Sequence, residues 1–151
     1  MPTDSSRPTH PALFLDVMLG KLTTYLRMCG YDTAYALDSG IEDDDEILEL
    51  ARNEGRTLVT RDVRLSERAE DAILLESLAV TDQLRELTEW GFDLSLTVPV
   101  RCSSCNGRLI RDDDSPEHAP DGKRMWRCVD CGKQFWRGSH WASVERTLAD
   151  L

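Results

Sequence analysis

The sequence lacks long apolar runs and several motifs on which common enzyme classes depend. No stretch approaches the roughly 20 apolar residues that span a bilayer, and the opening MPTDSSRPTHPA has no apolar signal core. There is no G-x-S-x-G elbow, no G-x4-G-K-[ST] phosphate loop and no G-x-G-x-x-G fingerprint. These absences disfavour membrane proteins, serine hydrolases, P-loop enzymes and dinucleotide-binding enzymes, and we expect a soluble, cytoplasmic protein.

Histidine is also scarce, with three copies at His10, His118 and His140. A metal-independent ribonuclease that uses two histidines as acid and base would need two of them to converge. His10 lies in the polar start of the chain and His118 in an acidic loop, so this requires His118 to meet His140. We expect the chemistry to come from other side chains.

Basic residues are outnumbered, with 18 Lys and Arg against 28 Asp and Glu and a net charge of -10. This balance disfavours a polyanionic partner, because nucleic-acid binding depends on neutralising phosphates. The deficit lies in residues 1–100, which hold nine basic and 20 acidic residues, whereas residues 101–151 hold nine and eight. Only three of the basic residues are lysine, and this acidic, lysine-poor composition suggests adaptation to high salt. The second half is therefore the half expected to face nucleic acid.

Short apolar runs alternate with amphipathic segments from Leu13 to about Leu96, which predicts strands and helices in turn. We expect strands over 12–16, 31–37, 56–62 and 72–76, and helices over 18–30, 43–55, 63–71 and 81–91. Four such units predict an α/β fold with a mostly parallel sheet and right-handed crossovers. A last helix is expected over 139–151, with Ser139 as its N-cap.

Two C-x2-C pairs, Cys102 with Cys105 and Cys128 with Cys131, are separated by 22 residues. Four thiolates at this spacing predict a tetrahedral zinc site in a zinc ribbon. The alternatives are two disulfides, which an intracellular chain disfavours, or a redox C-x2-C motif, which would not need two copies. Because four protein ligands leave no open position, the zinc is expected to be structural.

Acidic residues stand where predicted strands end or the following helices begin. Asp16 interrupts the apolar run LFLDVML, and Asp62 ends the third strand. The helix starts add Asp43, Asp44, Asp45 and Asp82. In a parallel α/β sheet these positions meet at one edge. Each acid alone is explained as a cap or a surface turn, but together they predict an Mg²⁺ or Mn²⁺ site that activates water against a phosphodiester.

The segment FWRGSHW combines aromatic and basic side chains. Phe135, Trp136 and Trp141 could stack on unpaired bases, while Arg137 and His140 could contact phosphates. The alternative is that the aromatic side chains pack the ribbon against the sheet domain.

Six segments together carry a family resemblance from about Leu13 to Leu148: FLDVMLGKL, LRMCGYDT, DDDEILELA, LVTRD, RCSSCNG and CGKQFWRGSHW. Their combination resembles the Mut-7 C-terminal RNase domain family, which consists of PIN-like proteins with a zinc ribbon. The resemblance implies a PIN-like three-layer fold and metal-dependent cleavage of RNA. We accordingly divide the chain into a disordered start over 1–11, a PIN-like domain over 12–98 and a ribbon with a C-terminal helix over 99–151.

The resemblance also implies roles for individual acids. Asp16 corresponds to the first acid of the PIN-type site and Asp62 to the third. Asp44 is favoured as the second, with Asp45 and Glu46 as alternates, and the fourth could be Asp82.

Basic residues near this site are sparse, because the segment DVMLGKLTTYLR has valine and threonines where that family often has basic or aromatic residues. The candidates that remain for positioning phosphates are Lys21, Arg27 and Arg61. A different class of function also stays open: a non-catalytic adaptor whose ribbon binds RNA or a protein, with the acids serving as caps and surface charge.

Overall fold

The computed structural model describes residues 11–112 and 124–151 of the chain. Its elements, in order, are β1 (Leu13–Leu15), α1 (Gly20–Met28), β2 (Thr33–Tyr35), η1 (Ala36–Ser39), α2 (Asp44–Asn53), β3 (Thr57–Thr60), α3 (Val63–Arg68), β4 (Ala72–Leu74), α4 (Val80–Glu89), β5 (Leu109–Arg111), β6 (Trp126–Cys128), β7 (Gln134–Phe135) and α5 (Ser139–Ala149). None of the helices in these two ranges has the length and apolar character that crossing a membrane requires. The predicted disorder over 1–11 falls outside the described residues, apart from the buried Pro11, as do His10 and His118.

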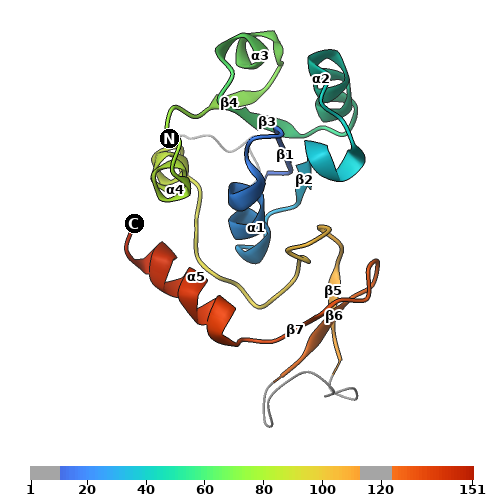
Figure 1. Cartoon of the computed structure of the whole chain (residues 1–151), viewed down its shortest axis with the longest axis vertical. Helices are drawn as coiled ribbons and strands as arrows, with labels where there is room; N and C mark the ends of the chain where they lie inside the picture. Colours follow the sequence, from blue (N-terminus) through green and yellow to red (C-terminus); the bar gives the residue numbers. More distant parts are fainter. Residues whose placement is uncertain (1–10, 113–123) are drawn as a thin grey trace.

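The first four strands form one parallel sheet in the order β2-β1-β3-β4 (Figure 1). Leu15 of β1 lies in register with Tyr35 on one side and with Val59 on the other. Strand β2 lies on one side of β1, and the next strand in the chain, β3, lies on the opposite side. The topological switch point therefore lies between β1 and β3, and the predicted α/β class with a mostly parallel sheet is confirmed.

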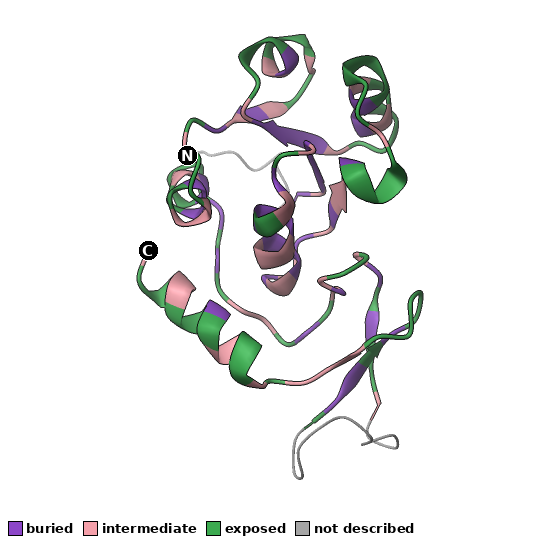
Figure 2. Cartoon of the chain, in the orientation of Figure 1, coloured by how far each residue is buried: buried purple, intermediate pink, exposed green. Residues whose placement is uncertain are grey.

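Alternation along β1 divides the core into two halves. Leu13 and Leu15 join a buried cluster with α1 and α4, whereas Phe14 joins a second cluster with α2 and α3. The helix residues in these clusters are Leu22, Leu26, Leu84 and Leu87 in the first, and Ile47, Ala51 and Leu65 in the second. Figure 2 shows the buried residues on the strands and on the helix sides that face them. The α/β unit thus has three layers.

The three remaining strands form a separate antiparallel sheet, the ribbon, in the order β5-β6-β7 (Figure 1). Leu109 and Trp126 form a small core there with buried cysteines. The last helix, α5, returns to the α/β unit, where Leu148 and Leu151 pack against the first core cluster. The chain segments before and after the ribbon therefore both contact the α/β unit.

The start of α5 differs from the prediction, because its N-cap is Gly138 and no side chain caps it. The predicted Ser139 cap is wrong: Ser139 is the first helical residue. Gly138 adopts φ -97° and ψ -152°, and a Cβ at this position would lie 2.8 Å from Nε1 of Trp136. The indole therefore packs closely on the backbone just before the helix, at a position where a Cβ would not fit.

Replacing Tyr31 with phenylalanine should lower the free energy of unfolding by about 1–2 kcal/mol, because two hydrogen bonds are lost. The Tyr31 hydroxyl accepts from the Asp93 N–H at 3.0 Å and donates to the Asp93 carbonyl at 3.2 Å. Urea unfolding of Tyr31→Phe measures this loss. Tyr25→Phe is the matched control, since the Tyr25 hydroxyl has no hydrogen-bond partner within the described ranges. Equal losses in both variants would contradict the assignment.

Candidate functional site

The Asp16 carboxylate lies at the carboxyl end of β1 and is only 6% exposed. The Val17 N–H donates to its Oδ1 at 2.7 Å, and the Thr60 hydroxyl donates to its Oδ2 at 2.7 Å. Thr60 reaches this position because Leu15 and Val59 are in register, so the next residues of β1 and β3 stand side by side. The two donors offset the cost of burying the carboxylate and fix its orientation.

Asp62 belongs to the same hydrogen-bond network. Its N–H donates to Oγ1 of Thr60 at 3.0 Å, and its Oδ1 caps α3 by accepting from the Leu65 N–H at 3.2 Å. Thr60 therefore connects Asp16 and Asp62 across the switch point between β1 and β3. Open parallel sheets bind their ligands at such a point, beyond the carboxyl ends of the strands.

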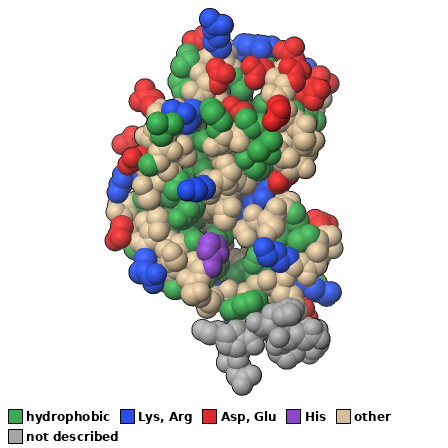
Figure 3. All heavy atoms as spheres, viewed as in Figure 1, with side chains coloured by type: hydrophobic (Ala, Val, Ile, Leu, Met, Phe, Trp, Pro, Cys, Tyr) green, Lys and Arg blue, Asp and Glu red, His purple; other side chains and the backbone are tan. Residues whose placement is uncertain are grey.

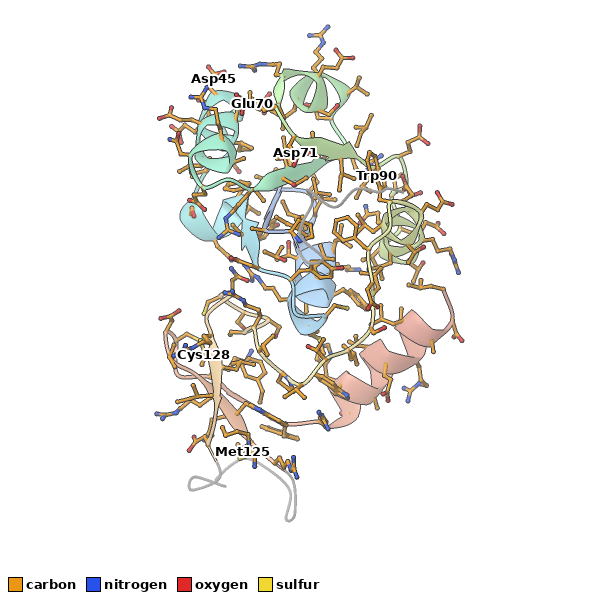
Figure 4. The ribbon with its side chains drawn as sticks, turned by 180° about the vertical axis from the view of Figure 1, so that it is seen from behind. Asp45, Glu70, Asp71, Trp90, Met125 and Cys128 are labelled. Atoms are coloured by element: carbon orange, nitrogen blue, oxygen red, sulfur yellow. The ribbon has the colours of Figure 1, made fainter. Side chains whose placement is uncertain are left out.

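The acids at the start of α2 face different neighbours. Asp44 stands three and seven residues before Ile47 and Ala51, which are buried against the sheet, so it shares their side of the helix. Asp45 instead forms an exposed ion pair with Arg68 at the end of α3. Figure 4 shows Asp45 on α2 beside the segment that follows α3, near Glu70.

These carboxylates do not form a compact cluster. Across residues 11–112 and 124–151, no three of them bring their oxygens within 4.8 Å of one another. Asp82, in the first turn of α4, forms a half-exposed ion pair with Arg85 at 2.8 Å. The donors at the switch point are carboxylate and hydroxyl oxygens, a set that suits Mg²⁺ or Mn²⁺, and Mg²⁺ usually binds one or two carboxylates and keeps several waters.

Tyr35 and Asp38 adjoin this edge, and neither was predicted from the sequence. The Tyr35 hydroxyl donates to the Val17 carbonyl at 2.7 Å. Burial, together with the negative charges of Asp38 and Asp16, raises the pKa of Tyr35, so its hydroxyl remains a donor at neutral pH. Asp38 lies in η1, the short helix that directly follows β2, and this position just beyond a strand end is the signal that could have identified it.

Two of the predicted phosphate-binding residues are close in sequence to the acids. Lys21 is exposed in the first turn of α1. Arg61 follows Thr60, and its buried Nε has no hydrogen-bond partner in the described part of the chain. Both positive charges are thus close in sequence to the residues that carry the Asp16–Asp62 network.

Arg27, the third basic candidate in the α/β unit, is 3% exposed and joins this unit to the ribbon. Its guanidinium donates to the carbonyls of Thr33 at 2.9 Å and Ser103 at 3.2 Å, and it pairs with Asp38 at 2.9 Å. The guanidinium of Arg27, which was predicted from the sequence to contact phosphate, therefore has three acceptors within the protein. In the structure Arg27 connects α1, β2 and the first cysteine knuckle, which is the turn over residues 102–107 that carries Cys102 and Cys105.

Asn106 makes the second connection between the knuckle and the α/β unit. Its Oδ1 accepts from the Thr33 N–H at 2.9 Å, and its Nδ2 donates to Asp32 at 2.7 Å. The residue adopts a φ of 73°, which asparagine tolerates better than most side chains. The knuckle is therefore docked on the amino end of β2, opposite the edge that carries Asp16.

The Asp32 carboxylate is the acceptor at the centre of this docking contact. Burial opposes its ionisation, but hydrogen bonds from Asn106 and Arg56 outweigh burial and hold its pKa below the usual range. A carboxyl group whose pKa is lowered on folding stabilises the protein at neutral pH, and this contribution is lost as the pH falls through the lowered pKa.

Arg137 and His140 lie where the ribbon meets α5. The Arg137 guanidinium is 5.5 Å from the ring centroids of both Trp126 and Trp141, so cation–π contacts join β6 to α5. His140 is exposed in the first turn of α5 and lines a cavity of about 610 Å³ between α1, the ribbon and α5. The FWRGSHW segment therefore packs the ribbon on α5 through Arg137 and also presents the exposed His140 to the cavity.

The four cysteines form a cluster in which all Sγ atoms lie within 4.8 Å of one another. The Sγ atoms of Cys102 and Cys131 are 3.7 Å apart, and those of Cys105 and Cys128 are 3.5 Å apart. Zn–S bonds of about 2.3 Å in a tetrahedron place sulfurs roughly 3.8 Å apart, so the cluster fits zinc. A Cβ on Gly107 would lie 2.6 Å from the Cys128 sulfur, which leaves room for glycine alone.

The thiols differ in their tendency to ionise. Burial raises the pKa of Cys105 to about 12. Burial also opposes ionisation of Cys128, but the backbone N–H groups of Asp130 and Cys131 donate to its sulfur and lower its pKa to about 7. Zinc binding would displace protons from such thiols and supply the charge that keeps the thiolates together.

The purified protein should contain one zinc ion per chain, and Cys128→Ser should lose it together with the ribbon fold. Loss of a structural zinc removes the cross-link between the two knuckles, so the melting temperature should also fall. Metal analysis and thermal unfolding measure both effects. Cys29→Ser is the control, because Cys29 is a buried cysteine outside the cluster and its replacement should leave the zinc content unchanged. A chain without bound zinc would contradict the assignment.

Asn106→Ala should lower the free energy of unfolding by about 2–3 kcal/mol. Two hydrogen bonds are lost, and alanine tolerates the positive φ of this position less well than asparagine does. Asn106→Gly loses the same hydrogen bonds without the backbone strain, so it should lose about 1 kcal/mol less. Urea unfolding of both variants separates the two contributions. A loss confined to the alanine variant would show that the docking hydrogen bonds contribute nothing.

Comparison with protein families matches residues 11–148 to the Mut7-C RNAse domain, which covers nearly the whole chain. Neither the comparison with curated proteins nor the comparison with solved structures gave a match. The match includes both the α/β unit and the ribbon with α5, in agreement with the resemblance found in the sequence.

Proposed function

Because the chain belongs to the Mut7-C RNAse domain family, we propose that it hydrolyses RNA phosphodiester bonds at the switch point between β1 and β3. The observation that carries this proposal is the buried Asp16 carboxylate, held by Val17 and Thr60 and connected through Thr60 to Asp62. Burial of a carboxylate is costly, and a purely structural role at this strand end would not require a charge. Its place at the switch point fits binding of a ligand.

The acids at this edge suit a catalytic Mg²⁺ or Mn²⁺. We propose that Asp16 and Asp62 hold the cation and that Asp44 approaches it from α2. Asp44 is preferred to Asp45 because Asp45 is engaged by Arg68, whereas Asp44 shares the sheet-facing side of the helix. A divalent cation at this place would supply an activated water and neutralise charge on the leaving oxygen.

The protein's own groups prepare this site before RNA binds. The two hydrogen bonds to Asp16 fix its carboxylate, so little reorganisation is needed when a cation or phosphate arrives. Asp62 accepts the Leu65 N–H through Oδ1, while its Oδ2 makes no hydrogen bond in the described part of the chain. Lys21 and Arg61 are proposed to contact the phosphates beside the scissile bond. Asp82, at the same edge, is proposed as a fourth acid.

The zinc ribbon is proposed to position the substrate. The four thiolates leave the zinc no open position, so the metal stabilises the ribbon and takes no part in the reaction. Arg137 and His140 are the ribbon-side residues proposed to face RNA, beside the cavity that α5 and the ribbon share with α1. Docking of the knuckle on β2 keeps this surface in a fixed position relative to the acids.

Asp16→Asn should reduce the cleavage of labelled single-stranded RNA on the order of 100-fold, because the carboxylate charge is lost while the side-chain shape is kept. Cleavage is measured with zinc-loaded protein in the presence of Mn²⁺ or Mg²⁺ and without either ion, with single-stranded DNA in parallel. Glu89→Gln, which removes one exposed charge at the end of α4, is the matched control and should retain full activity.

Two results would overturn this proposal. Cleavage that persists at full rate in Asp16→Asn would separate the activity from the acid network. RNA binding by the wild-type protein without cleavage under any of these conditions would favour a non-catalytic adaptor that acts through the ribbon.

A further inference from the structure

The cavity between α1, the ribbon and α5 is distinct from the acid edge, the sheet edge at the carboxyl ends of β1 and β3 that carries Asp16 and Asp62. Its volume is about 610 Å³, within the range of sites that hold a small molecule or a nucleotide. One wall is a face of α1 that runs from Gly20 to Met28. The opposite wall comes from the first knuckle, β7 and the start of α5. Figure 3 shows the surface hollowed where the α/β unit meets the ribbon.

The charge of this cavity is opposite to that of the whole chain. Among the described residues, its lining includes Arg27, Arg101 and Lys133 against the acidic Asp38, whereas acidic residues outnumber basic ones by ten in the sequence. Arg27 pairs with Asp38 and Arg101 lies 3.7 Å from the Asp32 carboxylate, so within the described residues Lys133 is the basic side chain of this lining without an acidic partner. Figure 3 shows acidic side chains gathered over α2, at the other end of the molecule. A positive cavity in an acidic protein favours an anionic ligand.

Aromatic side chains form the second feature of the lining, through Phe135, Trp136 and Trp141. The Trp136 indole is held against the backbone of Gly138, where a Cβ would approach its ring to 2.8 Å. The Trp141 ring is held by the Arg137 guanidinium, 5.5 Å from its centroid. Rigid rings are suited to stacking, because little side-chain entropy is lost when a flat ligand binds.

We propose that this cavity binds unpaired nucleotides of RNA, with bases stacked on Trp136 and Trp141 and phosphates beside Lys133 and Arg101. Aromatic platforms combined with basic side chains are the usual means of binding single strands. A duplex does not fit this description, since its bases are already stacked on each other and closed to the rings. The Lys133 ammonium lies 2.9 Å from the Ser104 hydroxyl and 5.7 Å from the Phe135 ring centroid, so it is positioned beside the aromatic wall.

The cavity also gives a path to the acid edge, and this part of the inference rests on the proposed ribonuclease function. Gly20 and Tyr35 line its far end, and the Tyr35 hydroxyl is bonded to the Val17 carbonyl, next to Asp16. From Gly20 to Met28 the helix wall is about 12 Å long, at 1.5 Å per residue. A single strand bound at the tryptophans would therefore reach the acids within a few nucleotides.

Binding of labelled RNA to the zinc-loaded, full-length protein tests the cavity separately from cleavage, when measured by fluorescence anisotropy without added Mg²⁺ or Mn²⁺. The wild type should bind a single-stranded 12-mer more tightly than the same sequence in a duplex. Trp136→Leu should weaken single-strand binding about 5- to 100-fold, and Trp136→Phe should restore most of it. Trp90→Leu is the control, because Trp90 lies half-exposed after α4, remote from the ribbon strand with Cys128 (Figure 4).

A second variant covers the case in which Trp136→Leu fails to fold, which loss of zinc would reveal. Lys133→Gln changes an exposed side chain and should make the slope of log K against log[salt] less negative by about 0.7. Wild-type affinity in both the Trp136→Leu and Lys133→Gln variants, or equal binding of duplex and single strand, would overturn the cavity assignment. Intact binding without cleavage would instead support the cavity and overturn the ribonuclease proposal.

Discussion

A carboxylate that is removed from water must find hydrogen-bond donors, and the architecture around Asp16 follows from this requirement. One donor is the adjacent backbone N–H of Val17, and the other is Thr60, which is supplied by β3. The parallel register of β1 and β3 is what brings that hydroxyl beside the acid. The same threonine accepts from the Asp62 backbone, so one side chain sets the orientation of one acid and the backbone of the other. The acid edge is therefore a property of the sheet and not of the loops alone.

Much of the fold was predictable because its signals are local. The alternation of apolar runs and helical faces gave the four β–α units, and the cysteine spacing gave the knuckles that the structure brings within metal-binding distance. Asp16 was predicted for a reason that needs no structure, since a charge inside an apolar run requires an explanation. The non-local partners were not predictable. Thr60 is an ordinary strand residue in the sequence, and its importance depends on a register that only the folded sheet defines.

Arg27 shows where prediction from the sequence stops, because the fold supplies partners that the sequence does not reveal. Arg27 was a candidate for phosphate contact, but its three acceptors come from β2, η1 and the first knuckle, and the first two of these follow it closely in sequence while the third is 76 residues away. Asn106 gave no signal at all, although it completes the same attachment. Charge and motif identify residues that are able to bind a ligand. They do not reveal that a partner elsewhere in the chain already occupies the side chain.

The return of α5 to the main core has a consequence for how firmly the ribbon is held. Leu148 and Leu151 anchor the end of the chain on the first core cluster, while residues before the ribbon continue directly from the α/β unit. Undocking of the knuckle would therefore leave it tethered at two points, and its effective concentration beside β2 would remain high. The polar contacts made by Arg27 and Asn106 therefore act on a ribbon that is already tethered beside its docking surface. A free domain on a single linker would need a much larger interface for the same occupancy.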